Sequence, residues 1–340
     1  MSALRPIEII GGGLAGLSLG LALRRAGAPV TLIDAGHYPR HRVCGDFITG
    51  LEQATIDRLG LAPFLSDALH HREIAWFHRA QLIRLQTLPA VAYGLSRHAL
   101  DARLAAAFVS AGGDLRCDTR ALDLEPTPGR VHANGRSRRE SPWLGLKLHV
   151  HGLDLTRDLE LHLGEQAYVG LARTESGTVN VCGLFHRRPI SAPGPALLAA
   201  YLAAAGLPAL ASRIARAEPD PASCSAVAAL DYAAAPSVPD TLRLGDAYGL
   251  IPPFTGNGMA VALQSAETSL APLLAYARHE TDWTTACRKG TAAMRHRFRI
   301  RLFTARALHP FLLRPRRQRW LVALTRARLL PLRPLYTLLH

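Results

Sequence analysis

The chain has 340 residues, of which 49% are hydrophobic and 19% charged, so it can bury a substantial core and intrinsic disorder is excluded. No run of 18 uncharged apolar residues occurs, and the first apolar stretch, which starts at Ile7, is interrupted at Gly11. We therefore expect neither a membrane-spanning helix nor a cleavable signal peptide. Five cysteines, an odd number without a C-x-x-C pair, favour a reduced cytoplasmic chain with no bound metal.

The net charge of +14 is confined to one part of the sequence. The last acidic residue is Asp282, and 14 of the 40 lysines and arginines follow it, which leaves residues 1–282 neutral with 26 basic and 26 acidic side chains. A basic surface on the folded body, which nucleic-acid binding would require, is therefore not expected. The basic residues after Asp282 need a separate explanation.

The N-terminal part follows the pattern of a βαβ unit. Residues 7–10 predict a strand, residues 14–27 a helix and residues 30–34 a second strand. Apolar residues return at helical spacing in residues 98–111, and residues 115–124 are predicted to be extended.

The middle of the chain changes character. From Trp143 to Phe185, apolar residues alternate with polar ones in short segments separated by Gly, Asp and Ser, a pattern typical of an antiparallel sheet. Further strands are predicted at 223–232 and 242–244, and helices at 194–216 and 258–275.

The segment Gly11-Gly12-Gly13-Leu14-Ala15-Gly16 is a G-x-G-x-x-G placed between the first strand and the first helix. Here Gly11 permits the tight turn, Gly13 lets a pyrophosphate approach the backbone, and Gly16 lets the helix pack closely on the sheet. The helix N-terminus attracts the phosphates, and Asp34, at the end of the second strand, can accept hydrogen bonds from ribose hydroxyls. This combination predicts a dinucleotide-binding site.

A second candidate segment lies far along the chain. The strand at 242–244 leads into Gly245-Asp246, where a carboxylate can bind the ribityl chain of FAD. The loop Pro253–Gly258 then offers backbone N–H groups and a helix N-terminus, which favour the negative charge of a reduced flavin. Nicotinamide chemistry has no use for this second site, so the cofactor we expect is FAD.

These segments resemble the FAD-dependent oxidoreductases of the superfamily that contains aromatic hydroxylases, flavin-dependent halogenases and geranylgeranyl reductases. The resemblance is strongest to the geranylgeranyl reductase branch, which places a Pro-Arg and a Cys-Gly pair after the ribose-binding acid. The segment Pro39-Arg40-His41-Arg42-Val43-Cys44-Gly45-Asp46 occupies that place here.

The resemblance implies roles for individual residues. It assigns the pyrophosphate to Gly11, Gly13, Leu14, Ala15 and Gly16. Asp34 would bind the adenosine ribose, and Arg42 and Arg97 would lie near the phosphates. The backbone at Ala121 would contact adenine. Gly245 and Asp246 would bind hydroxyls of the flavin side, and the loop under the isoalloxazine would contain Pro253, Gly256 and Gly258.

Departures from the other branches narrow the function. Aromatic hydroxylases carry Gly-Asp-Ala-Ala-His, where this chain has Tyr248-Gly249 after Ala247, and their Asp-Gly before a Ser is missing. The Trp-x-Trp motif of halogenases is absent, since all four tryptophans are isolated. The only lysines are Lys147 and Lys289, so the flavin-side lysine of halogenases is not matched either. We expect reduction or dehydrogenation of a C–C bond in a lipophilic isoprenoid or polyketide-like substrate. An FAD-dependent monooxygenase and a membrane-peripheral electron-transfer flavoprotein remain as alternatives.

Two further expectations concern the chemistry. Only one dinucleotide fingerprint is present, so NAD(P)H would visit transiently or another carrier would supply electrons. Cys44 is the candidate catalytic residue, because a thiol over the isoalloxazine can protonate a developing carbanion; the alternative is a buried packing residue. The sequence leaves the oligomeric state open.

The expected fold is α/β. An FAD-binding Rossmann-like domain would comprise 1–67, 96–139 and 236–275, with an inserted antiparallel-sheet substrate domain of 68–95 and 140–235. Residues 276–340 would form a basic helical C-terminal region, in which arginines alternate with Phe, Trp and Leu. Such helices can lie at an anionic membrane surface, here the inner face of the membrane, or pack on the body with a solvated basic face.

Overall fold

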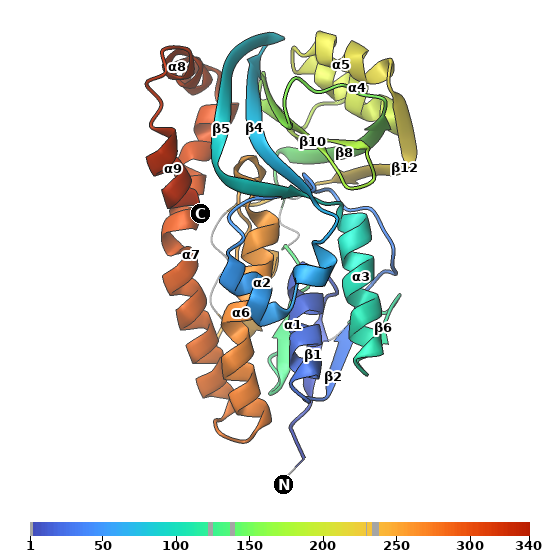
Figure 1. The fold of residues 1–340 in the computed structure, drawn as a ribbon, viewed down its shortest axis with the longest axis vertical. Helices are drawn as coiled ribbons and strands as arrows, with labels where there is room; N and C mark the ends of the chain where they lie inside the picture. The colour runs from blue at the N-terminus through green and yellow to red at the C-terminus, as the bar shows by residue number, and fades with distance from the viewer. Residues whose placement is uncertain (1–2, 122–124, 137–139, 229, 233–237) are drawn as a thin grey trace.

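The computed structural model describes residues 3–121, 125–136, 140–228, 230–232 and 238–340. It confirms the α/β fold: a parallel sheet and a larger sheet lie one above the other, and the C-terminal helices run along one side of both (Figure 1). The predicted segments 115–124 and 223–232 fall partly outside the described residues.

The parallel sheet is built around the predicted βαβ unit. Its strand order is β13-β7-β1-β2-β6, and β1 pairs in parallel with both of its neighbours. Its strands are β1 (Ile7–Ile10), β2 (Val30–Ile33), β6 (Asp114–Arg116), β7 (Arg130–His132) and β13 (Leu242–Arg243). Of the strand predicted at 115–124, the described residues 115–121 contain only the end of β6.

Three helices form a layer on this sheet: α1 (Leu14–Arg25), α3 (Arg97–Ser110) and α6 (Gly258–Ala277). The helix α1 packs between the other two, and its residues from Leu14 to Leu23 are buried. Their apolar side chains and those of β1 and β2 form the largest core cluster. The short helix α2 (Gln53–Leu59) packs against α6.

The second sheet has the order β12-β8-β11-β10-β9-β4-β5-β3. Its strands are β3 (Phe47–Ile48), β4 (Leu69–His78), β5 (Gln81–Gly94), β8 (Trp143–His151), β9 (Leu159–Gly164), β10 (Ala167–Arg173), β11 (Val179–His186) and β12 (Glu218–Val227). All neighbours are antiparallel except β4 and β9, which pair in parallel. The expectation of a purely antiparallel sheet was wrong at this pair, because a long connection through α3 and β6 joins the two strands and no tight turn imposes opposite directions.

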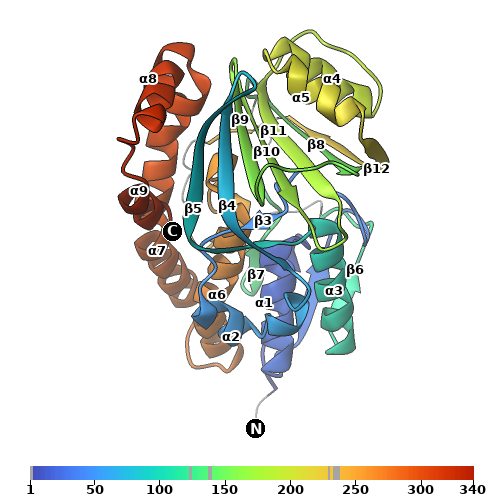
Figure 2. The ribbon, with the colours of Figure 1, turned by 45° about the horizontal axis from the view of Figure 1, so that its top comes forward.

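One face of this sheet is covered by α4 (Pro195–Ala204) and α5 (Pro208–Ala215). A single helix was predicted over 194–216; the structure divides it at Gly206, whose φ of 73° is left-handed. The other face meets the C-terminal helices α7 (Trp283–Leu313) and α8 (Pro315–Arg326), as Figure 2 shows.

The C-terminal region is an integral layer of the fold. The helix α7 packs along α6 and buries Met294, Phe298 and Ala305 completely, and the last helix is α9 (Leu332–Leu339). The sequence left two interpretations of this region, contact with a membrane surface and packing on the body. The inner face of the region packs on the body. No helix in the described ranges is long and apolar enough to cross a membrane.

Candidate cofactor and substrate site

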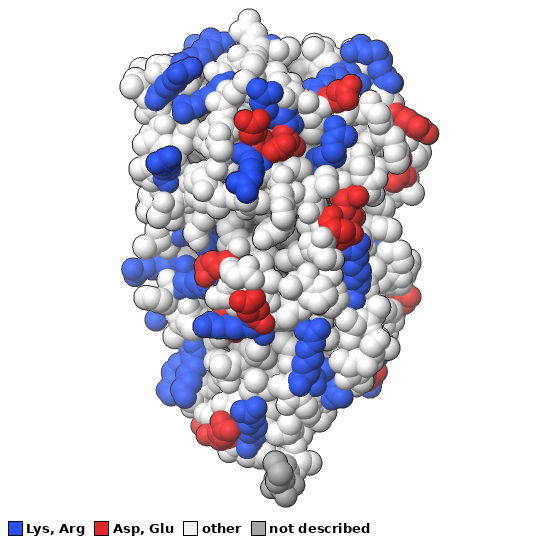
Figure 3. Space-filling view, viewed as in Figure 1, with Lys and Arg blue, Asp and Glu red and all other residues white. Residues whose placement is uncertain are grey.

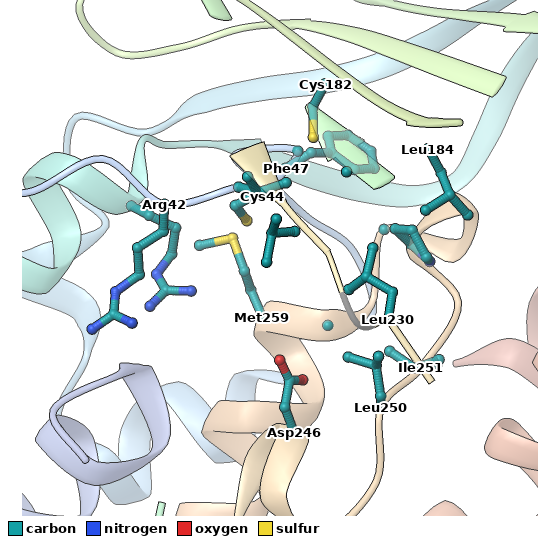
Figure 4. Close-up of a pocket in the computed structure, with 18 of the residues that line it drawn as sticks. Arg42, Cys44, Phe47, Cys182, Leu184, Leu230, Asp246, Leu250, Ile251 and Met259 are labelled. Carbon is teal, nitrogen blue, oxygen red and sulfur yellow. The ribbon is translucent and has the colours of Figure 1, made fainter. Parts of the chain in front are cut away.

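A cavity of about 1060 Å³ lies where the two sheets meet. All predicted site residues except Gly16 and Ala121 line it: Gly11, Gly13, Leu14, Ala15, Asp34, Arg42, Cys44, Arg97, Gly245, Asp246, Pro253, Gly256 and Gly258. Figure 4 shows that Arg42 and Asp246, from distant parts of the chain, face the same space. Its volume is at the upper end of the range of about 300–1,000 Å³ for small-molecule sites.

The three glycines of the first motif have different physical constraints. A Cβ on Gly11, whose φ is 109°, would stand 2.3 Å from the Ala133 carbonyl oxygen, and a Cβ on Gly16 would stand 2.0 Å from the Gly11 carbonyl oxygen. Both positions therefore need glycine for packing; Gly16 sits against the Gly11 backbone and does not line the cavity. At Gly13 the nearest atom to a Cβ is an Arg97 nitrogen at 3.8 Å, so this residue leaves room on the cavity side.

Asp34 follows β2 and is nearly buried. Its carboxylate accepts hydrogen bonds from the backbone N–H groups of Gly12, at 2.6 Å, and Gly36, at 2.8 Å. It also forms an ion pair with Arg40, and Arg42 Nη2 lies 3.6 Å away. The predicted ribose-binding acid thus lines the cavity with its carboxylate already held by the glycine loop.

Arg42 and Arg97 meet at a buried carboxylate that the sequence analysis missed. Arg97 forms two hydrogen bonds to Asp101, of 2.8 and 2.7 Å, and Arg42 Nε lies 3.3 Å from the same carboxylate. Burial disfavours the charged form of Arg97, but Asp101 outweighs this and raises its pKa. Two fixed cations therefore lie beside the N-terminus of α1, the place where a pyrophosphate would bind.

The second motif approaches the cavity from the other side. Gly245 has a φ of 55°, and the turn after β13 directs the Asp246 carboxylate into the cavity (Figure 4). The side chain is exposed to this open space, but its depth inside the protein raises its pKa. In the following loop Gly256 has a φ of 68°, and a Cβ there would stand 2.6 Å from Thr49. The helix α6 then begins at Gly258.

Beneath the Cys44–Gly45 pair lies a buried charged cluster that the sequence analysis did not identify. Asp46 Oδ2 lies 2.6 Å from Lys147 Nζ and 2.8 Å from His149 Nε2, and the Asp46 and Lys147 side chains are fully buried. Burial acts against ionisation of Asp46, but Lys147 and His149 outweigh it and lower its pKa. Asp46 also accepts a 3.1 Å hydrogen bond from the backbone N–H of Arg97, so the cluster ties the loop before β3 to the first turn of α3.

Cys44 is positioned by this cluster and by the larger sheet. Its carbonyl oxygen accepts a 2.8 Å hydrogen bond from the Asn180 side chain. Burial, followed by the charge of Asp46, raises the pKa of the Cys44 thiol to about 11. The residue therefore carries a proton at neutral pH and faces the cavity as a weak acid rather than a nucleophile.

The part of the cavity farthest from the glycine loop is apolar. It is lined by Ile74, Leu161, Tyr168, Leu184, Leu230, Leu250, Ile251 and Phe254. Two polar atoms of its lining, Trp76 Nε1 and Tyr232 Oη, are buried without a hydrogen-bond partner among the described residues. We call this part the apolar arm. The alternation of Leu159, Leu161 and Leu163 was the only sequence signal for it, and that signal did not distinguish a cavity from an ordinary core.

The residues present fit FAD. Four glycines on the cavity wall, Gly13, Gly45, Gly135 and Gly258, have no protein atom within 3.7 Å of the place where a Cβ would stand. A flat ring and a phosphate can therefore approach the backbone closely. Arginines and the α1 N-terminus supply the charge that phosphates need, and Asp246 can accept hydrogen bonds from a polyol. The described residues contain no group of three His, Cys, Asp or Glu side chains arranged for a metal.

Comparison with known proteins agrees with this fit. Residues 5–144 match the family described as FAD binding domain. Menaquinone reductase of Mycolicibacterium smegmatis is 27% identical over 138 residues, which are 39% of this chain and 34% of that protein. The same enzyme of Mycobacterium tuberculosis is 36% identical over 66 residues, 19% of this chain and 16% of its own length. The matched regions thus span about a third or less of these relatives.

Solved structures show the same fold over nearly the whole chain. A p-nitrophenol 4-monooxygenase of Pseudomonas putida has a TM-score of 0.74 at 15% identity, covering all of this chain and 97% of that one. A geranylgeranyl bacteriochlorophyll reductase-like protein of Thermoplasma acidophilum has a TM-score of 0.71 at 17% identity, with coverage of 94% and 91%. Residues 5–144 therefore match an FAD-binding domain, as the first motif predicted, and the chain shares the fold of these solved structures.

Proposed function

We propose that this FAD-binding chain reduces, or in reverse dehydrogenates, a C–C bond of a lipophilic isoprenoid or polyketide-like substrate. The observation that carries the proposal is the continuity of one cavity from the glycine loop through Asp246 to the apolar arm. A cofactor with a polar end and a hydrocarbon substrate can meet in such a space. The name of the Mycolicibacterium and Mycobacterium relatives makes menaquinone the first substrate to test.

Each part of the cavity has a separate task in this proposal. The α1 N-terminus, Arg42 and Arg97 bind the pyrophosphate, and Asp246 binds a hydroxyl of the flavin side. The apolar arm holds the substrate chain and excludes water. Trp76 Nε1 and Tyr232 Oη lie there as hydrogen-bond donors for an oxygen of the substrate.

Cys44 completes the reduction. Bound FAD, once reduced by NAD(P)H or another two-electron donor, would supply hydride chemistry at its N5 for one carbon of the double bond. The other carbon then needs a proton, which the Cys44 Sγ–H donates; water restores it. The Cys44 thiol carries the proton that this role requires at neutral pH, and its pKa of about 11 makes it a weaker acid than an exposed thiol.

An anaerobic experiment separates this function from its alternatives. The flavin of the purified protein is reduced with light or dithionite, and menaquinone or a geranylgeranyl compound is added under argon while absorbance near the flavin band is followed. We expect reoxidation without oxygen and a product that is still two mass units heavier after any quinol formed has been reoxidised in air. A requirement for oxygen, with one oxygen atom gained by the product, would identify a monooxygenase. Reoxidation only by a partner protein would identify an electron-transfer flavoprotein.

Replacing Asp246 with Ala should weaken FAD binding. The change removes a charge-assisted hydrogen bond of about 1.5–3 kcal/mol, which corresponds to a Kd about ten- to a hundredfold higher. Asp246→Asn, which keeps an acceptor oxygen without the charge, should fall between Ala and wild type. Flavin fluorescence titration of the apoprotein measures both. Equal affinities in all three proteins would place the carboxylate outside the flavin site.

Replacing Cys44 with Ala should slow reduction while leaving the bound flavin spectrum unchanged. Loss of a positioned acid typically costs about 10²–10⁴ in rate. The second cavity thiol, Cys182, provides the matched variant: burial raises its pKa further, so Cys182→Ala should cost less. Single-turnover reoxidation with substrate measures both. A Cys44→Ala rate within twofold of wild type would make Cys44 a packing residue.

A further inference from the structure

The outer faces of α7 and α8 expose large apolar side chains at one end of the molecule. The exposed fractions are 73% for Phe303, 70% for Trp320 and 69% for Leu329, and Phe311 and Leu324 are exposed to a smaller degree. Single exposed apolar residues are ordinary, but four on one helical hairpin, with Leu329 just after the end of α8, are not. We call this surface the α7–α8 corner.

The geometry of α8 explains why Trp320 and Leu324 point outward. Its buried residues, Gln318, Leu321, Val322 and Thr325, occupy one stripe of the helix. At about 3.6 residues per turn, Trp320 and Leu324 fall on the side opposite that stripe. Arg316 and Arg317 flank them on the same outer side. The helix therefore has two apolar faces, one in the core and one exposed between arginines.

The charge around the corner has one sign. Arg314, Arg316, Arg317, Arg319 and Arg328 are exposed, and no acidic side chain of the described residues lies within ion-pair distance of them. In Figure 3 the upper left edge, where α8 lies in Figure 1, carries basic side chains and no acidic ones. By contrast, Arg297, lower on α7, is neutralised by Glu52 and Glu267.

The inner side of the same hairpin reaches the apolar arm. Leu312 and Leu313 at the end of α7, and Leu321 and Val322 on α8, belong to one buried cluster with Leu161, Leu184 and Leu230. The last three residues line the cavity. Only the thickness of this hairpin therefore separates the exposed corner from the wall of the apolar arm.

We infer that the α7–α8 corner docks on the surface of an anionic lipid bilayer. Arginine stems lie along apolar surface and place their charges at headgroup level, while Trp320, Phe303 and Leu329 enter the boundary with the acyl chains. A nucleic acid would use the arginines but leave the aliphatic side chains in water. In a dimer formed through this corner, the arginines of one copy would face the arginines of the other, and their like charges would repel. An anionic bilayer satisfies both the charge and the apolar area.

Docking is independent of the proposed reaction, although it would place the apolar arm close to a membrane-dissolved substrate. The test therefore measures binding without turnover. The full-length protein is incubated with vesicles of phosphatidylglycerol and phosphatidylcholine, or of phosphatidylcholine alone, and sedimented at 50 and 500 mM salt. Substitutions are used instead of truncation, because α7 contributes Met294 and Phe298 to the core.

We expect binding to the anionic vesicles that weakens with salt. The pair Arg316→Glu and Arg317→Glu should lower the partition coefficient about tenfold or more. The pair Arg278→Glu and Lys289→Glu, exposed near the connection between α6 and α7, changes the net charge equally and should have little effect. Trp320→Ala should abolish the blue shift of tryptophan fluorescence on vesicle addition, whereas Val109→Ala, an exposed apolar control on α3, should retain it.

Three results would overturn the inference. The first is equal binding to neutral and anionic vesicles by all variants, and the second is no binding by the wild type. The third is equal loss of binding in both charge-reversal pairs, which would indicate a diffuse effect of net charge. Dimerisation detected by light scattering and abolished by Trp320→Ala would instead assign the corner to a second copy of the chain.

Discussion

Replacing Gly13 with Val should give a folded protein that no longer retains FAD. The structure explains why the effect is selective. A Cβ at this position is 3.8 Å from the nearest protein atom, so the side chain extends into the cavity and not into a neighbouring element. It would occupy the space in which a pyrophosphate approaches the N-terminus of α1. Because Gly13 precedes the helix at a φ of −89°, a substituted residue adopts the same backbone without strain.

The neighbouring Gly11 is the control for this prediction. A Cβ there would meet the Ala133 carbonyl oxygen at 2.3 Å, and φ is 109°, so Gly11→Ala should lower the melting temperature of the apoprotein itself. Absorbance at the flavin band and thermal unfolding of the apoproteins distinguish the two effects. A Gly13→Val protein with full flavin occupancy, or one whose apoprotein melts as early as Gly11→Ala, would contradict the separation of roles.

The local motifs predicted most of this site because their function depends on the backbone. A glycine turn followed by a helix, and a Gly-Asp after a strand, fix where a few atoms point whatever surrounds them. These two motifs predicted the positions of Gly13 and Asp246 on the cavity wall, whereas Arg42 was assigned only through the family resemblance. Ala121 was assigned to adenine only through the family resemblance, on an extended segment that carries no such constraint, and it does not line the cavity.

The buried cluster below Cys44 was missed because it is a property of the tertiary fold. Asp46 lies just before β3 and Lys147 in β8, about a hundred residues apart in the sequence, so no periodicity brings them together. The only sequence signal was a lysine inside the apolar alternation of Leu146, Leu148 and Val150. In a chain with two lysines such a position indicates a buried charge that requires a partner, but it does not identify the partner. The parallel pairing of β4 with β9 was missed for the same reason.

Replacing Lys147 with Met should reduce the free energy of unfolding by about 3–5 kcal/mol, because the fully buried Asp46 carboxylate loses the cation that neutralises it. Arg116→Met is the matched control, since Arg116 pairs with Asp114 at the surface and such pairs contribute about 1 kcal/mol or less. The double variant Asp46→Asn with Lys147→Met removes both charges and should recover much of the loss. Denaturant unfolding of the apoproteins measures all four.

The same substitution should change how stability depends on pH. The folded-state pKa of Asp46 is lowered, so its contribution to stability is complete above the usual carboxyl pKa of about 3.9 and is lost as the pH falls through the lowered value. Without Lys147, burial becomes the stronger influence and should raise the pKa of Asp46. Lowering the pH from 7 towards 5 should then narrow the difference in unfolding free energy between Lys147→Met and wild type. A difference that stays constant over this range, or that the double variant does not reduce, would show that Lys147 acts through packing of its aliphatic stem instead of through its charge.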